Sequence, residues 1–235
     1  GEAFFNRVSA LLQGATNRVL IATWTFWMDM FLTGEPTGPG RQLFSDLKAA
    51  AARGVKIHIL VDFHNGSWVA PMLNKHLAEA NITIRTATHP HQVFKVKQSG
   101  SYHEKYISVD SKTALVGGID FHPQRYNNTR HNFKPNYIKF RDQDQGRGPK
   151  FIFPKKKKNN EEIKEFSILW HDSAVEVEGP IVIDLENDFA RRWDEAGHVP
   201  PFIPERPNPP PAGGHNVQLL ETDMLGGSTV PSTAS

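Results

Sequence analysis

The chain has 235 residues, 38% of them hydrophobic, and a formal net charge of +2, which fits one sizeable domain with a buried core. So small a net charge creates no general field that would attract nucleic acid or an anionic membrane. The absence of cysteine excludes disulfides and thiolate metal sites, and no apolar stretch reaches the length of a membrane span. Because the chain starts at Gly1 inside a predicted helix, we expect it to be a piece of a longer protein. The sequence predicts no particular localisation.

The first part of the chain alternates between helical and extended patterns. In chain order we expect a helix at 3–15, a buried strand at 18–26, a helix at 41–54 closed by Gly54, a strand at 55–63, a helix near 69–80 and a strand at 82–87. A Gly- and Pro-rich loop at 33–40 follows the first strand. This alternation predicts a layered α/β fold with mainly parallel neighbouring strands.

The second part adds two strands, at 102–110 and 113–119, joined by a turn at Asp110-Ser111-Lys112. A strand at 166–179 and a helix at 181–197 close the ordered pattern. The sequence therefore predicts several further strands after the helix expected near 69–80.

Composition divides the chain into three parts. Residues 1–198 form the predicted domain, with a polar, basic insertion at about 127–160 that holds Lys155 to Lys158. A proline-dense stretch at 199–214 is typical of a linker. Residues 215–235 are expected to be the start of a second repeat or a disordered tail.

The stretch SYHEKYISVDSKTALVGGID, residues 101–120, gathers the groups with the clearest chemistry. On a strand His103 and Lys105 point the same way, so an imidazole stands beside a cation. Imidazole can attack a phosphorus centre while lysine neutralises its oxygens, without a metal. The adjacent glycines Gly117 and Gly118 would let backbone N–H groups approach an anion. A half-exposed strand with alternating polar residues has the same spacing, so spacing alone leaves both interpretations open.

The full motif decides between them. His-x-Lys-x-x-x-x-Asp, here His103, Lys105 and Asp110, is followed by ALVGGID and resembles the HKD motif of the phospholipase D superfamily. It is most similar to the first motif of the eukaryotic-type phospholipases D. The resemblance also covers RVLIATWTF, GVKIHILVDF, GGIDFHPQRY and WHDSAVEVEGPIVIDLENDFARRW, so it spans about residues 1–197 without the insertion.

The resemblance implies one repeat of a phospholipase D-type mixed β-sheet between helices, and a set of catalytic residues. His103 would be the nucleophile that forms a phosphohistidine, and Lys105 would bind the phosphate oxygens. Asp110 would support the structure of the motif. Asp172 would accept a hydrogen bond from the other ring nitrogen of His103 and fix its tautomer.

The resemblance also implies a substrate-binding set. Gly117 and Gly118 fall at the glycine pair of the family, and His122 would line the pocket. Asp120 stands where other branches carry an asparagine that contacts phosphate, and since a carboxylate would repel an anion we expect it to act indirectly. No cofactor and no metal is implied.

Family enzymes combine two HKD motifs, whereas this sequence holds one. Three interpretations stay open: half of a two-motif enzyme, a single-motif phosphodiesterase or nuclease that works as a homodimer, or a non-catalytic half that binds phosphate groups. The linker at 199–214 favours the first. The expected reaction is hydrolysis or transphosphatidylation of a glycerophospholipid such as phosphatidylcholine at a membrane surface, and nucleic acid is not an expected partner. Trp24 and Phe26 are expected in the core or at the rim of an acyl-chain groove.

Overall fold

The structure, a computed structural model, describes only part of the chain: residues 1–26, 31–33, 41–62, 74, 77, 79–87, 102–122, 125–126, 171–197 and 214–219. The predicted insertion at 127–160, nearly all of the linker and most of the helix expected near 69–80 lie outside these residues. Among the described helices, none is long and apolar enough to cross a membrane.

Six strands form the central sheet. They are β1 (Arg18–Thr23), β4 (Lys56–Asp62), β5 (Ile82–Ala87), β6 (Tyr106–Val109), β7 (Thr113–Gly117) and β8 (Ala174–Glu178). Their order across the sheet is β5-β4-β1-β6-β7-β8, and the short strands β2 (Phe31–Thr33) and β3 (Arg41–Gln42) pair separately. The central strands are apolar and rich in β-branched residues, as expected for strands covered on both faces.

The sheet is mixed. Strand β1 pairs parallel with β4, and β4 pairs parallel with β5. The parallel neighbours expected from the first part of the chain are therefore confirmed. The pairs β1–β6, β6–β7 and β7–β8 are antiparallel. Strands β6 and β7 are joined by a tight turn, where Asp110 and Ser111 both have positive φ and reverse the chain at once. The broader prediction, a mixed sheet between helices, is confirmed.

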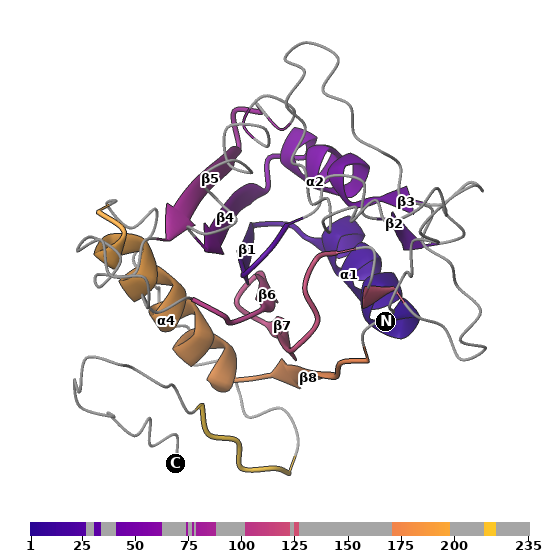
Figure 1. Cartoon of the computed structure of the whole chain (residues 1–235). Coiled ribbons are helices and arrows are strands. Elements are labelled where there is room, and N and C mark those ends of the chain that lie inside the picture. The colour runs from indigo at the N-terminus through magenta and orange to yellow at the C-terminus, as the bar shows by residue number, and fades with distance from the viewer. Residues whose placement is uncertain are drawn as a thin grey trace, which may run out of the picture.

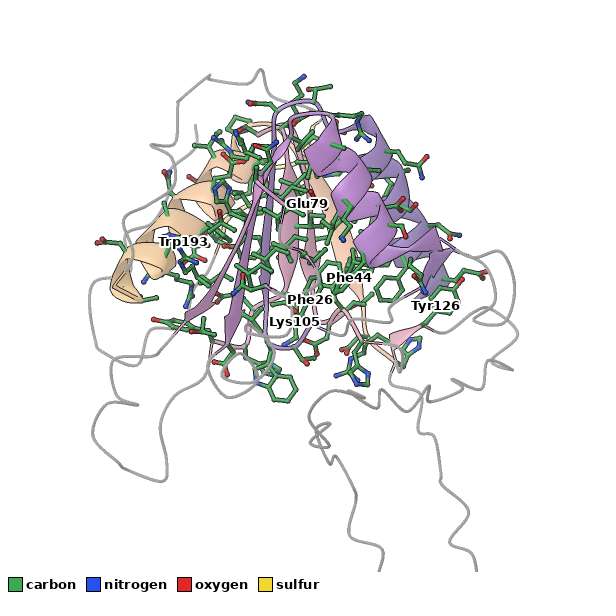
Figure 2. The ribbon with its side chains drawn as sticks, turned by 90° about the horizontal axis from the view of Figure 1, so that it is seen from above. Phe26, Phe44, Glu79, Lys105, Tyr126 and Trp193 are labelled. Atoms are coloured by element: carbon green, nitrogen blue, oxygen red, sulfur yellow. The ribbon has the colours of Figure 1, made fainter. Side chains whose placement is uncertain are left out.

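Helices cover both faces of the sheet. The helices α1 (Glu2–Gly14) and α2 (Leu43–Ala52) lie on one face, and α4 (Ile181–Glu195) lies on the other, as the edge-on view in Figure 2 shows. Figure 1 shows the same layers with α4 beside β1, β6 and β7 on the side away from α1. Each helix buries one apolar stripe, which is what an amphipathic helix on a sheet requires.

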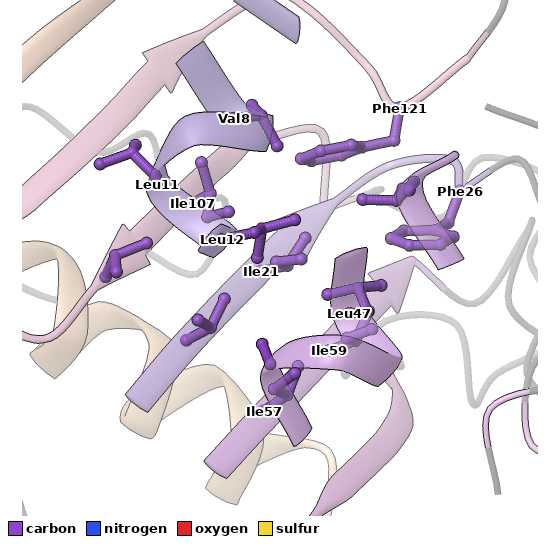
Figure 3. Close-up of a cluster of buried hydrophobic side chains, with 14 of the residues drawn as sticks. Val8, Leu11, Leu12, Ile21, Phe26, Leu47, Ile57, Ile59, Ile107 and Phe121 are labelled. Atoms are coloured by element: carbon purple, nitrogen blue, oxygen red, sulfur yellow. The ribbon is translucent and has the colours of Figure 1, made fainter. Parts of the chain in front are cut away.

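The larger core cluster fills the layer between the sheet and the first two helices. Figure 3 shows Leu12 of α1, Leu47 of α2 and Ile21 of β1 meeting in this layer. Phe26 and Phe121, beyond the ends of β1 and β7, stack with ring centroids 5.6 Å apart and close the layer at one end. A second cluster, built around Leu185, Phe189 and Trp193, packs α4 against the opposite face.

The predicted helices and strands that fall in the described residues agree with this fold, although several strands are shorter than predicted. The first strand ends at Thr23 instead of residue 26, and β6 begins at Tyr106, after His103 and Lys105. Both differences fall at the same end of the sheet. His103 and Lys105 of the motif therefore lie in a loop at this end, where side chains are not committed to the two faces of the sheet.

Candidate active site

The candidate site lies at the end of the sheet where β1, β4 and β7 finish and where β6 and β8 begin. Lys105 marks this end in Figure 2, and Glu79 marks the other. Segments far apart in sequence meet here because antiparallel β6 and β8 start where their neighbours end. In open sheets with parallel strands, the carboxyl ends of those strands are the usual position for a binding crevice.

His103 and Lys105 are brought into direct contact. The Nζ atom of Lys105 lies 3.0 Å from Nδ1 of His103 and donates a hydrogen bond to the His103 carbonyl oxygen at 2.6 Å. The lysine is buried while the histidine is exposed, so the ammonium contacts the imidazole from the interior of the protein. Because an ammonium can only donate, Nδ1 is the acceptor and the neutral ring carries its proton on Nε2.

Trp24, just after β1, forms the wall beside this pair. Its ring centroid lies 5.2 Å from that of His103, and Lys105 Nζ lies 5.8 Å from the ring centroid. An indole face attracts a cation within about 6 Å of its centroid and also limits the water around it. Trp24, expected in the core or at the rim of a groove, is thus placed against the reactive pair.

Burial and charge keep His103 neutral. Desolvation first, and then the Lys105 ammonium, lower the pKa of His103, while Asp120 and Asp62 oppose this shift. Desolvation also lowers the pKa of Lys105, against the raising effect of Asp120. A histidine with a lowered pKa keeps a free nitrogen lone pair at and below neutral pH, which a nucleophile needs.

Behind the pair, two carboxylates and an arginine form a row of charges. Asp120 is fully buried, with Oδ1 3.6 Å from Lys105 Nζ and Oδ2 accepting a hydrogen bond from Arg125 at 3.1 Å. Arg125 Nε lies 3.5 Å from Oδ2 of Asp172. Asp120 therefore acts on the site through the two cations that it neutralises.

Asp172 is placed differently from the expectation. It lies just before β8 and contacts Arg125, but it forms no hydrogen bond with the His103 ring in the described part of the chain. The ring nitrogen Nδ1 faces Lys105 instead. The structure thus brings Asp172 to the site, while the predicted His103–Asp172 contact is not formed.

The glycine pair provides space. The amide of Gly117 donates to the Lys105 carbonyl at 3.1 Å and that of Gly118 to the Ser173 carbonyl at 2.9 Å, so both are engaged in strand pairing and do not face an anion. A Cβ atom at Gly118 would lie 2.5 Å from Oδ1 of Asp172, and one at Gly117 would collide with the Ser173 carbonyl. The expected approach of these amides to phosphate is replaced by close packing of β7 on the segment that carries Asp172.

Asp110, the third residue of the motif, lies at the opposite end of β6. Its carboxylate accepts hydrogen bonds from the backbone N–H groups of Thr16, Asn17 and Arg18 and from the Thr16 hydroxyl, at 2.8–2.9 Å. Because carboxylates bound by several N–H groups favour the charged form, these bonds lower its pKa although burial opposes them. Asp110 ties the β6–β7 turn to the start of β1 and does not reach the pocket.

His122 follows Asp120 in the loop that leads to Arg125. Burial, and then the charge of Arg125, lower its pKa to about 4, so it is neutral under ordinary conditions. Sequence reasoning missed Arg125. It also missed Asp62, which ends β4 and accepts a hydrogen bond at 2.8 Å from the backbone N–H of Tyr102, next to His103. The signal for Asp62 was its position at the end of a buried strand, whereas Arg125 followed no pattern of spacing. No cluster of three possible metal-binding side chains occurs among the described residues.

Comparisons with known proteins identify the family of the chain. The family described as "Cardiolipin synthase, PLD-like domain" matches residues 8–137, which is more than half of the chain. The chain belongs to the phospholipase D superfamily, a family of phosphodiesterases, and the resemblance of its HKD motif is confirmed.

Among curated proteins, Phospholipase D C of Dictyostelium discoideum is 27% identical over 218 residues, covering 83% of this chain and 12% of that protein. Cardiolipin synthase A of Pseudomonas fluorescens is 26% identical over 222 residues, covering 94% of this chain and 37% of that protein. The chain thus spans 12% to 37% of the length of these relatives.

Among solved structures, the phospholipase D family member Nuc from Salmonella typhimurium is similar at 16% identity and a TM-score of 0.44, covering 80% of this chain and 86% of that one. At this level of likeness the assignment rests on the sheet, the motif and the family match.

Proposed function

We propose that this chain supplies the nucleophile and the phosphate-binding cation of a phosphodiester cleavage, with a glycerophospholipid such as phosphatidylcholine as substrate. The observation that carries the proposal is the contact between a neutral, exposed imidazole and a buried ammonium, His103 Nδ1 and Lys105 Nζ, 3.0 Å apart. A phosphate oxygen can replace the ring nitrogen as the acceptor for Lys105, because anionic oxygens accept stronger hydrogen bonds than neutral nitrogens. The replacement frees the lone pair of that nitrogen beside the bound phosphorus.

The reaction then proceeds in two displacements. A nitrogen of His103 forms a bond to phosphorus while the bond from phosphorus to the leaving alcohol breaks, which gives a phosphohistidine. Lys105 neutralises the charge on the non-bridging oxygens. In the next step water, or a second alcohol, attacks the phosphorus and gives its proton to the group that protonated the leaving alcohol, while the bond from phosphorus to His103 breaks.

The leaving alkoxide needs a proton from an acid on the far side of the phosphorus. In this proposal the acid is the histidine of a second HKD motif, from a second repeat of the same protein or from a second copy of the chain. General acid catalysis contributes roughly 10² to 10⁴ in rate, so an isolated monomer is expected to be nearly silent.

The test measures choline release from short-chain phosphatidylcholine over a range of protein concentrations, with light scattering for mass. The chain is assayed alone and mixed with a fragment that carries a second HKD repeat. In the active assembly His103→Ala and Lys105→Met should lower turnover by several orders of magnitude. Lys112→Met, at an exposed lysine in the turn just after the motif, is the matched control and should keep the rate.

The outcomes separate the alternatives. Activity that rises with the dimer fraction supports the single-motif homodimer, and activity restored by the second repeat supports the half-enzyme. Ordinary rates from His103→Ala would overturn the assigned nucleophile. No turnover in any assembly would overturn the assignment of enzymatic activity and would support a non-catalytic module that binds phosphate groups.

A further inference from the structure

Arg125 connects the two carboxylates of the site. It lies in the loop after β7, with its side chain only 11% exposed, and it donates a hydrogen bond to Asp120 at 3.1 Å. On its other side Nε lies 3.5 Å from Asp172, so one guanidinium joins the exit of β7 to the entry of β8. Its neighbour Tyr126, labelled in Figure 2, stacks on Phe5 of α1 with centroids 5.8 Å apart, which anchors the loop.

The contacts of Arg125 influence which acceptors the Lys105 ammonium binds. An ammonium has three N–H groups, and the Lys105 ammonium directs two of them to His103, to the carbonyl oxygen and to Nδ1. The buried carboxylate of Asp120 is the obvious competitor for the lysine, yet it lies 3.6 Å away, beyond good hydrogen-bond length. Arg125 donates to Oδ2, the other oxygen of Asp120, and so neutralises part of the charge that would draw Lys105 to Oδ1, which has no hydrogen-bond partner of its own among the described residues.

We propose that Arg125 is a positioning residue: by holding Asp120 and Asp172 it keeps Lys105 bonded to His103 and available to a phosphate oxygen. A buried carboxylate that loses one of its two cations binds the other more tightly, because the low local dielectric strengthens the remaining pair. Without Arg125, Lys105 would move toward Asp120 and away from the reacting nitrogen. The inference rests on the proposed function, since it assigns Lys105 to the substrate.

The test uses the titration of His103 in the resting protein, which needs no turnover. Among the described residues, the charged groups that act on His103 are Lys105, Asp120, Asp62 and Arg125. Arg125→Met removes one cation and draws Lys105 toward Asp120, and both changes should raise the pKa of His103. Labelled-histidine NMR measures this pKa, with the signal assigned by its loss in His103→Ala.

Three further variants sharpen the result. Arg125→Met combined with Asp120→Asn removes one charge of each sign, so Lys105 should return to His103 and the pKa of His103 should return toward the original value. Arg125→Lys keeps the charge but cannot bridge two carboxylates, and should give an intermediate pKa. Arg191→Met, on the exposed side of α4, is the matched control and should leave the pKa of His103 unchanged.

The second readout is binding of inorganic phosphate, followed through the same His103 signal. Arg125→Met should weaken phosphate binding about tenfold, and the double variant should recover most of it. An unchanged His103 pKa in both Arg125→Met and Arg125→Lys would overturn the inference. If Arg125→Met does not fold, the double variant and Arg125→Lys still decide, because a purely structural role predicts no return of phosphate binding with Asp120→Asn. If the proposed function is wrong but the Arg125 inference holds, the NMR effects appear and His103→Ala leaves turnover intact.

Discussion

The two ends of the sheet use the same HKD motif in opposite ways. At the far end of β6, Asp110 accepts four hydrogen bonds from the segment Thr16–Arg18, and the Arg18 guanidinium is bonded to Ser111 and to the buried Glu186. At the near end, Lys105 lies between His103 and Asp120 and bonds only the first. The far end, the closed end, is held by the hydrogen bonds to Asp110 and Glu186, whereas at the near end, the open end, Lys105 has no hydrogen bond to Asp120.

The difference shows how a fold separates stability from chemistry. A carboxylate whose acceptor sites are filled by backbone N–H groups holds the chain and has nothing to offer a ligand. A lysine held at hydrogen-bond length by a histidine, but not by the nearby aspartate, can exchange its partner for a phosphate oxygen. We expect substitutions at the closed end to change the free energy of unfolding, and those at the open end to change turnover and phosphate binding.

The largest effect on stability is expected from Arg18→Met. Arg18 Nη2 lies 2.6 Å from Oε2 of Glu186, which is fully buried, so the substitution leaves a charge in the core without its cation. Breaking a buried ion pair from one side costs about 3–5 kcal/mol. Urea unfolding should show this loss, and adding Glu186→Gln should recover part of it. A loss below about 1 kcal/mol would mean that the closed end does not depend on this pair.

A pH effect of somewhat smaller size should come from His58 on β4. Burial, and then the charges of Arg18 and Lys56, lower its pKa from 6.5 to about 4. Between these two pH values the unfolded chain binds a proton that the folded chain does not, so stability is complete above about pH 6.5 and falls as the pH falls toward 4. The loss is about 2–3 kcal/mol. His122, also lowered to about 4, contributes in the same window.

Urea midpoints at pH 7, 5.5 and 4.5 measure this dependence. His58→Gln should flatten the curve and leave the share of His122. A curve for His58→Gln that is as steep as that of the unchanged protein would exclude His58 as its source.

Gly118→Ala tests the open end. Its Cβ would lie 2.5 Å from Asp172 Oδ1, so the carboxylate must move, and with it the contact to Arg125. A displacement of about 1 Å in a positioned group can lower turnover by up to about 100-fold, so we expect a tenfold to hundredfold loss of phosphodiesterase activity in the active assembly.

Substitutions at two other glycines serve as comparisons for this loss of activity. Gly117→Ala meets backbone atoms of Ser173 and Ala174 and should weaken the β7–β8 pairing, hence stability. Gly14→Ala, with open space around its Cβ position at the end of α1, should leave activity unchanged and should not destabilise the fold. A Gly118→Ala variant that unfolds as readily as Gly117→Ala would place Gly118 among the structural residues.

The smallest effect is expected from Asp110→Ala. The carboxylate accepts four hydrogen bonds, but several of its partners are exposed and can bind water instead, so we expect a loss of about 1–2 kcal/mol. Lys112→Ala, in the same turn with an exposed side chain, should stay within about 0.5 kcal/mol. Differential scanning calorimetry would show both. A phosphate affinity that falls in Asp110→Ala while stability does not would contradict the separation of the two ends.

Much of this protein was open to prediction from sequence. The period of apolar residues identified α1, β1, β4, β5 and α4 within a few residues, because local burial alone produces those periods. The HKD motif and the glycine pair identified the superfamily and the reactive pair, since His103 and Lys105 are near in sequence and must lie close together in any extended backbone. The turn at Asp110-Ser111-Lys112 was equally local.

Tertiary structure alone decided the partners of these residues. Asp110 meets Thr16 across 94 positions, Asp172 meets Arg125 instead of His103, and the glycine amides pair with Lys105 and Ser173 instead of facing an anion. The antiparallel order of β6, β7 and β8 brings the end of β7 and the start of β8 to the same end of the sheet. The period of hydrophobic residues in a sequence does not specify which strands become neighbours. Charge pairing between distant loops therefore follows from the completed sheet, and Arg125 could be assigned only after the sheet had placed it between two carboxylates.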